Sequence, residues 1–402
     1  MRVSTSLIYQ LGLDSISRGQ GDLVRTQQQL SLGQRLLAPA DDPIASVQIL
    51  QTEQAQGRNS QYSANIGASK ASLGSYESSL AQVTAELQSI RTLAVNGGSG
   101  VLSDSDRAAL ATELEGRLQH ILGIANGKDS AGHYLYAGFQ VDTQPFVVSP
   151  AGANYVGDQG QVSLQVASGR ELESSENGNA IFEKIPTGNG TFTTTAAVSN
   201  AGTGLVSGGQ VTNLAALTGH TYTLQFSVVG ATTTYDILDA TTSSVVSSGN
   251  AYQSGGTIGV GGLQAQISGA PANGDSFTIA PSGNQSMFKT VQDLVQTLRT
   301  PANTPSLRTR LANGLNSALQ NIDQALEHVL VTRSSVGARL NELDALTADN
   351  DSRSLQYQAT LSDLRDLDYN KALSDFARQQ LALEAAQKSF VKVTGLTLFN
   401  LT

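Results

Sequence analysis

Histidine is the side chain that most often binds a metal ion or transfers a proton near neutral pH, and the chain contains four. None of them stands at metal-ligand spacing, and two lie inside helical patterns, where we expect exposed or interfacial positions. They are His120, His133, His220 and His328, of which His120 and His328 are the helical ones. The sequence therefore predicts no metal and no cofactor.

Two adjacent carboxylates, Asp41 and Asp42, could act as a general acid and a general base. A structural role explains them better, because Asp42 is a good N-cap and Pro43 is a good first residue of a helix. Ser334-Ser335 has no flanking glycine elbow, and the absence of Cys excludes thiolate nucleophiles, thiolate metal sites and disulfides. We therefore expect the protein not to be an enzyme.

The composition narrows the range of partners. The net charge is −9 and the basic residues are scattered singly, so no cluster is available to grip nucleic acid. No run reaches the about 18 consecutive apolar residues that a membrane span requires. The N-terminal stretch has neither a continuous apolar block nor an A-x-A site, so we expect no cleavable secretory signal.

Both ends of the chain carry an apolar residue at every seventh position. Such a repeat places one narrow seam on a helix, and another helix must cover that seam. The repeats are Ile16, Leu23, Leu30 and Leu37 at the start, and Tyr369, Phe376, Leu383 and Phe390 at the end. We expect a helix over residues 1–40, weakened by Gly12, Gly19, Gly21 and Gly33 and dependent on a partner for order. The economical interpretation is that the two termini pack on each other as a coiled coil.

Longer helices are predicted inside these ends. Between residues 44 and 95, the apolar residues from Leu73 to Ala94 keep a 3-4 spacing without interruption. After a glycine-rich loop, Ser103 or Asp104 can cap a second helix. A third long helix carries the seven-residue repeat Leu315, Ile322, Val329, Val336 and Leu343, and we expect it to pack against the first.

The middle of the chain changes character. Residues 185–288 contain no Lys or Arg, and apolar residues alternate at Tyr222–Val228, Tyr235–Ile237 and Leu263–Ile267. Period-two alternation is typical of half-buried strands, so we expect a small all-β domain here rather than a disordered segment. A shorter hairpin is predicted earlier, with its turn at Ser168-Gly169-Arg170.

These elements are nested along the sequence. The predicted fold is mainly α with an inserted all-β domain, in a rod-like order that runs out and returns. The expected parts are a terminal coiled coil (1–42 and 361–402), a central helical bundle with β-hairpins (43–184 and 281–360) and an outer β domain (185–280).

The terminal sequences resemble the flagellin superfamily, and within it the family of hook-filament junction proteins. The matching stretches are 2–5, 27–35, 39–43, 366–369, 383–390 and 396–399, the last reading Leu396-Thr397-Leu398-Phe399. The resemblance implies a structural, motility-related subunit, exported by the flagellar type III apparatus and located outside the cell in the bacterial flagellum. It further implies self-association in a ring and contacts with another hook-associated junction protein, with flagellin and with an export chaperone. The seam residues, together with Leu398 and Phe399, are then the expected assembly interface.

Two other functions stay open at this point. The chain could be flagellin itself, although flagellins usually close on a Leu-Leu pair and this chain ends in Leu398-Phe399-Asn400-Leu401-Thr402. The β domain could instead carry an enzyme, such as a hydrolase inserted in an assembly scaffold. The sequence offers that activity no nucleophile–base set.

Overall fold

The computed structural model describes the backbone of residues 5–150 and 152–399. Within these ranges it describes all side chains except those of residues 5, 6, 8 and 394–399. The chain divides into two compact units, which we call the terminal unit (Met1–Ala64 with Ala345–Thr402) and the central unit (Asn65–Asp344). Two long helices, α2 (Pro43–Gly97) and α5 (Pro305–Arg365), contribute to both units.

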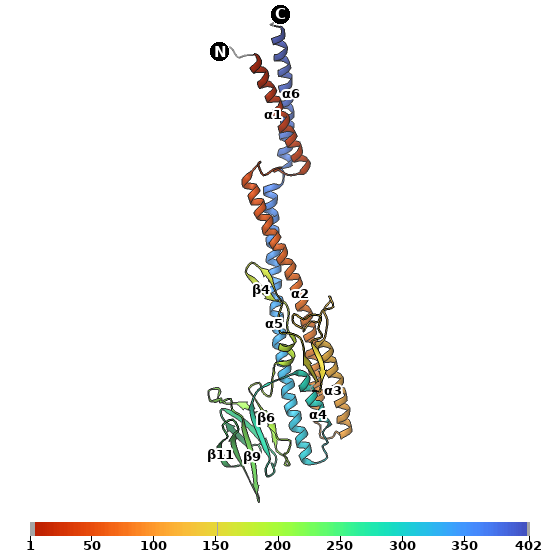
Figure 1. Ribbon diagram of the computed structural model, residues 1–402, viewed down its shortest axis with the longest axis vertical. Helices are drawn as coiled ribbons and strands as arrows, with labels where there is room; N and C mark the ends of the chain where they lie inside the picture. The colour runs from red at the N-terminus through yellow and green to blue at the C-terminus, as the bar shows by residue number, and fades with distance from the viewer. Residues whose placement is uncertain (1–4, 151, 400–402) are drawn as a thin grey trace. The chain divides into compact units, whose positions relative to one another are not determined.

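The terminal unit is helical. Helix α1 (Thr5–Leu32) lies antiparallel beside α6 (Tyr369–Phe399), so the first and last helices of the chain pack on each other (Figure 1). The prediction of one helix up to residue 40 is wrong at its end, because Gly33 adopts φ +67° and its N–H bonds to the carbonyl of Gln29 at 2.8 Å. A glycine in this left-handed conformation terminates a helix. Leu37 therefore lies in a linker and not on the helix.

In the central unit, the predicted apolar positions are buried. The apolar residues of α2 from Leu73 to Ala94, which follow the 3-4 spacing, are between 0% and 2% exposed. The residues of the seven-residue repeat of α5 are between 0% and 3% exposed. Helix α3 (Asp104–Ala125) begins with Ser103 in a capping box with Asp106, which decides between the two expected caps. Helix α4 (Met287–Arg299) buries Phe288 and Leu294 and packs beside α3. The helical periodicity was therefore a reliable guide to burial.

Short strands and an aromatic cluster link the helices to the rest of the central unit. The elements are β1 (Phe146–Ser149), β2 (Gly152–Tyr155), β3 (Ser163–Ala167), β4 (Arg170–Glu173), the π-helix η1 (Asn179–Glu183), β5 (Ile185–Pro186) and β15 (Asn284–Gln285). Strands β3 and β4 pair through a turn at Gly169, which has φ +78°, so the predicted hairpin is confirmed. The ring of Phe146 lies 5.3 Å from that of Phe182 and 5.0 Å from that of Phe288.

The inserted β-rich region forms two antiparallel sheets. One has the order β11-β10-β9-β14-β6, and the other has the order β12-β13-β7 with β8 also on β13. The strands are β6 (Phe192–Ala196), β7 (Leu205–Val206), β8 (Gln210–Val211), β9 (Tyr222–Val229), β10 (Thr232–Asp239), β11 (Ser244–Ala251), β12 (Thr257–Val260), β13 (Leu263–Ser268) and β14 (Ser276–Pro281), with a 3₁₀ turn η2 at Leu214–Ala216. The alternating residues of both sheets form one buried cluster. The prediction of a mainly helical chain with an inserted β domain is confirmed.

This burial gives the β-rich region an expected resistance to chymotrypsin. Trypsin has no site between residues 185 and 288, but chymotrypsin could cut after aromatic residues that become accessible. Phe192, Phe226 and Phe277 are each 1% exposed, whereas Phe139 in a preceding loop is 65% exposed. We expect brief digestion of the full chain to cut after Phe139 and to leave the β-rich region intact, as mass spectrometry would show. Cleavage after Phe226 at the same rate as after Phe139 would mean that the two sheets do not hold together.

Candidate functional site

The contact between α1 and α6 contains most of the residues in which sequence analysis located a function. On α1, Ile16, Leu23 and Leu30 are half-buried, and Thr26 between them is 7% exposed. These positions follow the 3-4 spacing that keeps one side of a helix turned toward a single partner. The α1 face of the contact is therefore a narrow seam.

The α6 face is built from the complementary repeat. Phe376, Leu383 and Phe390 are half-buried, and Ala372 is 6% exposed. The ring of Phe390 lies 5.1 Å from the ring of Tyr9 on α1. Half-burial of these large side chains means that a single partner helix covers only part of each one.

A hydrogen bond crosses the seam between α1 and α6. The hydroxyl of Thr26 lies 2.8 Å from the side-chain carbonyl oxygen of Gln379 and 3.0 Å from the carbonyl oxygen of Asp22 on its own helix, and its proton favours the shorter contact with Gln379. A polar pair inside a helix–helix seam restricts the register in which the helices can pair, because other registers leave the polar groups unmatched. The seam therefore carries a register signal in addition to apolar surface.

A short hydrogen-bonded joint follows the helix pair, where the chain leaves α1 and where it enters α6. The N–H of Arg35 bonds to the carbonyl of Arg365 at 2.8 Å, and the N–H of Leu367 bonds to the carbonyl of Gly33 at 3.0 Å. The guanidinium of Arg35 also donates to the carbonyl of Leu364 at 2.9 Å. Two breaks that are more than 300 residues apart in sequence are thus tied side by side.

The two adjacent carboxylates act in this joint. Asp42 accepts the N–H of Ala45 at 3.0 Å and caps α2, so the predicted capping role is confirmed. Asp41 accepts the N–H groups of Leu37 and Ala38 at 3.0 and 3.1 Å and pairs with Arg25 at 2.6 Å. The backbone N–H groups of Ala38 and Leu37 lower the pKa of Asp41 below its ordinary value. Because the pKa of Asp41 is lower in the folded protein than in the unfolded chain, the ionised carboxylate stabilises the fold at neutral pH. This stabilisation is lost as the pH falls through the lowered pKa.

Of the remaining predicted interface residues, Tyr369 lies beside Gly33 directly after α1, and Leu37 lies in the linker that follows. Leu37 lines a groove of about 570 Å³ together with Val47 and Leu50. Tyr369, the first residue of α6, is 53% exposed. The side chains of Leu398 and Phe399 lie outside the described residues. An interface role for all these residues stays a prediction.

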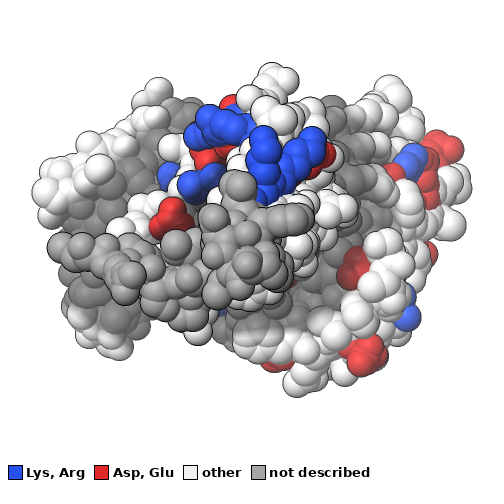
Figure 2. All heavy atoms as spheres, turned by 90° about the horizontal axis from the view of Figure 1, so that it is seen from above, with Lys and Arg blue, Asp and Glu red and all other residues white. Residues whose placement is uncertain are grey.

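The outer surfaces of the terminal helix pair carry large exposed apolar residues. Leu11 and Val24 on α1 are 55% and 51% exposed, and Leu373, Leu381 and Val391 on α6 are 56%, 69% and 69% exposed. In the end-on view of Figure 2, Lys and Arg side chains gather in one area of the described surface. Large apolar residues that remain exposed beside a helical seam are typical of a surface that further chains cover.

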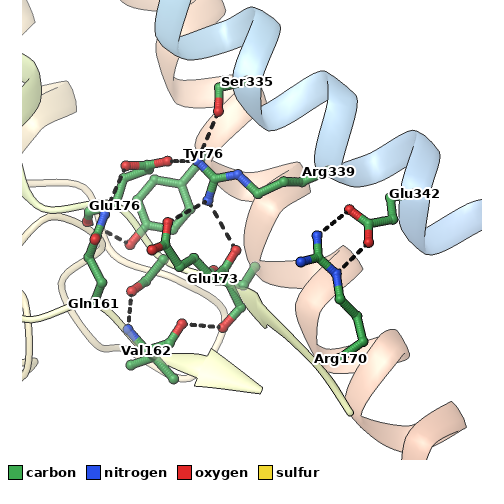
Figure 3. A network of polar contacts seen from close by, with 12 residues as sticks. Tyr76, Gln161, Val162, Arg170, Glu173, Glu176, Ser335, Arg339 and Glu342 are labelled. Carbon is green, nitrogen blue, oxygen red and sulfur yellow. Dashed lines mark hydrogen bonds and ion pairs between the residues drawn. The ribbon is translucent and has the colours of Figure 1, made fainter. Parts of the chain in front are cut away.

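The central unit contains a separate polar network that fixes the β3–β4 hairpin to the long helices (Figure 3). Arg339 of α5 donates to the carboxylate of Glu176, which is 7% exposed, and to the carbonyl of Glu173 at 3.0 Å. The hydroxyl of Tyr76 lies within hydrogen-bond distance of the carbonyls of Leu135 and Glu176, the latter at 3.2 Å. Burial raises the pKa of Tyr76 to about 12, so its phenol stays neutral and remains a donor. Arg170 of β4 makes a second, exposed pair with Glu342 at 2.6 and 2.8 Å.

The histidines do not converge on any site. His120 Nδ1 lies 2.9 Å from Glu86, His220 Nδ1 lies 2.6 Å from Asp239, and His328 Nε2 lies 2.8 Å from the carbonyl of Ala180. Among the described residues, no three His, Cys, Asp or Glu side chains are placed to hold a metal ion. Among the same residues, no helix is long and apolar enough to cross a membrane.

Sequence reasoning missed half of the α1 seam. Gly12 and Gly19 on α1, and Gly33 directly after it, occupy seam positions that alternate with the large residues, whereas the sequence alone indicates only that they weaken the helix. Their seven- and fourteen-residue spacing was the available signal. A search for apolar side chains does not detect it, because glycine has no side chain to count.

Comparison with known proteins first identifies the class of protein to which this chain is similar. Residues 3–141 match the family described as the bacterial flagellin N-terminal helical region, which places the start of this chain among flagellin-like proteins. Flagellar hook-associated protein 3 of Escherichia coli strain K12 is 27% identical over 406 residues, covering 100% of both chains.

Solved structures narrow the class further. Flagellar hook-associated protein 3 from Legionella pneumophila is 31% identical, with a TM-score of 0.74, covering 79% of this chain and 98% of that one. FlgL of Xanthomonas campestris is 33% identical, with a TM-score of 0.72, covering 77% of this chain and 99% of that one. The chain belongs to the family of flagellar hook-associated protein 3. It is thus a structural component of the flagellum and not an enzyme.

Proposed function

We propose that this chain joins hook-side proteins to the flagellin filament as a subunit of the junction between them. A relative from Legionella pneumophila, 31% identical and with a TM-score of 0.72, is called the flagellar junction protein. The matches over almost the whole length of these relatives favour the junction role over the alternative that the chain is flagellin itself.

The partners follow from that role. They are further copies of this chain in a ring, another hook-associated junction protein, flagellin, and an export chaperone before assembly. The chain would leave the cell through the flagellar type III apparatus without a cleavable signal peptide and would work outside the cell.

The observation that carries this proposal is the incomplete covering of the terminal helix pair. The seam residues are only half-buried by the partner helix, and Leu373, Leu381 and Val391 stay exposed on α6. Covering such surface with a neighbour is favourable by roughly 25 cal/mol per Å² of apolar area removed from water. A single chain leaves this surface in water, whereas a closed ring would cover it in every copy.

We further propose that different parts of the chain have different roles. Residues 1–42 and 361–402 form the terminal coiled coil that assembles, and residues 43–184 and 281–360 form the helical bundle with β-hairpins behind it. Residues 185–280 form an outer β domain, which the nested order of the sequence favours placing away from the assembling ends. The rod-like arrangement of these parts stays a prediction.

Site-specific photo-crosslinking tests the proposal. A photoreactive amino acid in place of Leu381 should crosslink to neighbouring subunits in isolated flagella, because that residue is 69% exposed on α6. The same group in place of Leu214, which is 77% exposed in the β-rich region, is the matched control and should give few products. Crosslinks from position 214 without any from position 381 would contradict the proposed assembling surface.

A further inference from the structure

We propose that the side chains between α1 and α6 select a single register for the terminal helix pair. They form layers in which a glycine faces a large α6 side chain, and one further layer that is polar. The residues that determine this specificity are Gly12 and Gly19 on α1, Gly33 directly after α1, and the Thr26–Gln379 pair. Each glycine faces a large α6 side chain. This property concerns the pairing within one chain. Its consequence for assembly rests on the proposed function.

The first layer is the tightest. A Cβ atom added at Gly12 would lie 2.5 Å from Cδ2 and 2.7 Å from Cε2 of Phe390. The same ring is held from the side by Tyr9, at 5.1 Å between ring centroids. The Phe390 ring therefore rests directly on the α1 backbone, and only glycine at position 12 leaves room for it.

The other glycine layers repeat this arrangement. A Cβ atom at Gly19 would lie 3.4 Å from Cδ1 of Leu383, which is ordinary contact. A Cβ atom at Gly33 would lie 2.7 Å from the hydroxyl oxygen of Tyr369, and Gly33 also has φ +67°. The layers thus differ in tolerance, with position 19 the most permissive and positions 12 and 33 the most restrictive.

The spacing of the layers makes the match specific. Gly19 follows Gly12 by seven residues on α1, and the α6 residue that faces Gly19, Leu383, precedes the one that faces Gly12, Phe390, by seven residues. The same relation links Gly33 to Tyr369 over two further repeats. A constant relation across three layers is the register of an antiparallel pair.

The polar layer excludes the neighbouring registers. If α6 slipped by one seven-residue repeat in either direction, Thr26 would face Ala372 or Ala386 in place of Gln379. The hydrogen bond between Thr26 and Gln379 could then not form, although glycine positions would still admit large side chains. The glycines therefore allow the two helices to approach closely, and the Thr26–Gln379 pair selects one register among those that differ by seven residues.

Amide hydrogen exchange of the full chain separates this proposal from a general effect on helix stability. Alanine is the better helix former, so a glycine-to-alanine change should slow exchange in α1 unless it disturbs packing. Gly21 has no atom within 4 Å of an added Cβ and is the matched control. We expect Gly21→Ala to leave exchange in α1 and α6 unchanged or slower, and Gly12→Ala to accelerate it at least tenfold.

A compensating variant completes this test. Gly12→Ala combined with Phe390→Ala should restore slower exchange relative to Gly12→Ala alone, because the smaller side chain removes the clash. If Gly12→Ala behaves like Gly21→Ala, or if the wild-type α1 and α6 exchange like an unfolded chain, the proposed pairing is wrong.

The register itself can be measured with paired spin labels. The chain has no Cys, so Leu13→Cys and Val391→Cys, both at exposed positions, provide two unique labelling sites. We expect one distance in the otherwise wild-type chain. Adding Gln379→Ala should create a second population displaced by about 10 Å, the length of seven helical residues. A single unchanged distance would overturn the role of the polar layer, whereas a second population together with normal filament attachment would count against the proposed function instead.

Discussion

Leu383→Asp is expected to abolish attachment of the filament to the hook while the central unit stays folded. Leu383 is half-buried in the seam, and its Cδ1 lies where a Cβ on Gly19 would be only 3.4 Å away. A carboxylate there must lose water, take up a proton or separate α1 from α6, and desolvating an ion costs several kcal/mol. Every copy in a ring would repeat this defect.

Three measurements check this expectation in one strain. The variant should be found outside the cells, its central unit should melt at the wild-type temperature, and the cells should be non-motile with detached filaments. Leu214→Asp is the matched control, because the same change at a residue that is 77% exposed should be harmless. Normal motility of the Leu383→Asp strain would refute the claim that the terminal helix pair is the part of the chain that assembles.

Arg339→Leu is expected to give the largest loss of stability in the central unit. Removing the guanidinium leaves the carboxylate of Glu176, which is 7% exposed, without its charged partner. Breaking a buried ion pair from one side typically costs about 3–5 kcal/mol in the free energy of unfolding. Urea unfolding followed by circular dichroism would measure that change.

The matched control is Arg170→Leu. Arg170 pairs with Glu342 through two hydrogen bonds, but its side chain is 53% exposed, so the expected loss is below about 1 kcal/mol. Combining Arg339→Leu with Glu176→Leu should recover part of the stability, because neither charge then remains. Equal losses for the two arginine variants would show that burial of Glu176 does not set the energetics of this network.

The helices were predictable because their signal is local. The 3-4 spacing from Leu73 to Ala94 and the repeat from Leu315 to Leu343 each correspond to a buried helix face. The end of α1 was not predictable. Pro39 disfavours a helical conformation at Ala38 and is the strongest helix-ending signal in this part of the sequence, but Gly33 ends the helix earlier through its positive φ. The strands of the β-rich region were also predictable from alternation. Their order in the sheets was not, because β14 pairs with β9 across more than 40 intervening residues.

The candidate site was predictable only in part, for a related physical reason. The large seam residues, such as Leu23 and Leu383, are visible as a repeat of apolar side chains. The glycine half of the seam can be recognised only once the partner's large side chain is placed against it. The Arg339–Glu176 pair joins residues 163 positions apart, and no local pattern connects them.

Deletion of the gene, followed by electron microscopy and by assay of flagellin in the medium, tests the central claim most directly. The deletion strain should build hooks that carry no filaments and should shed flagellin into the medium. The wild-type gene supplied in trans should restore filaments, whereas the Leu383→Asp gene should not. Filaments of normal length and number on cells that lack this chain would contradict its role at the junction.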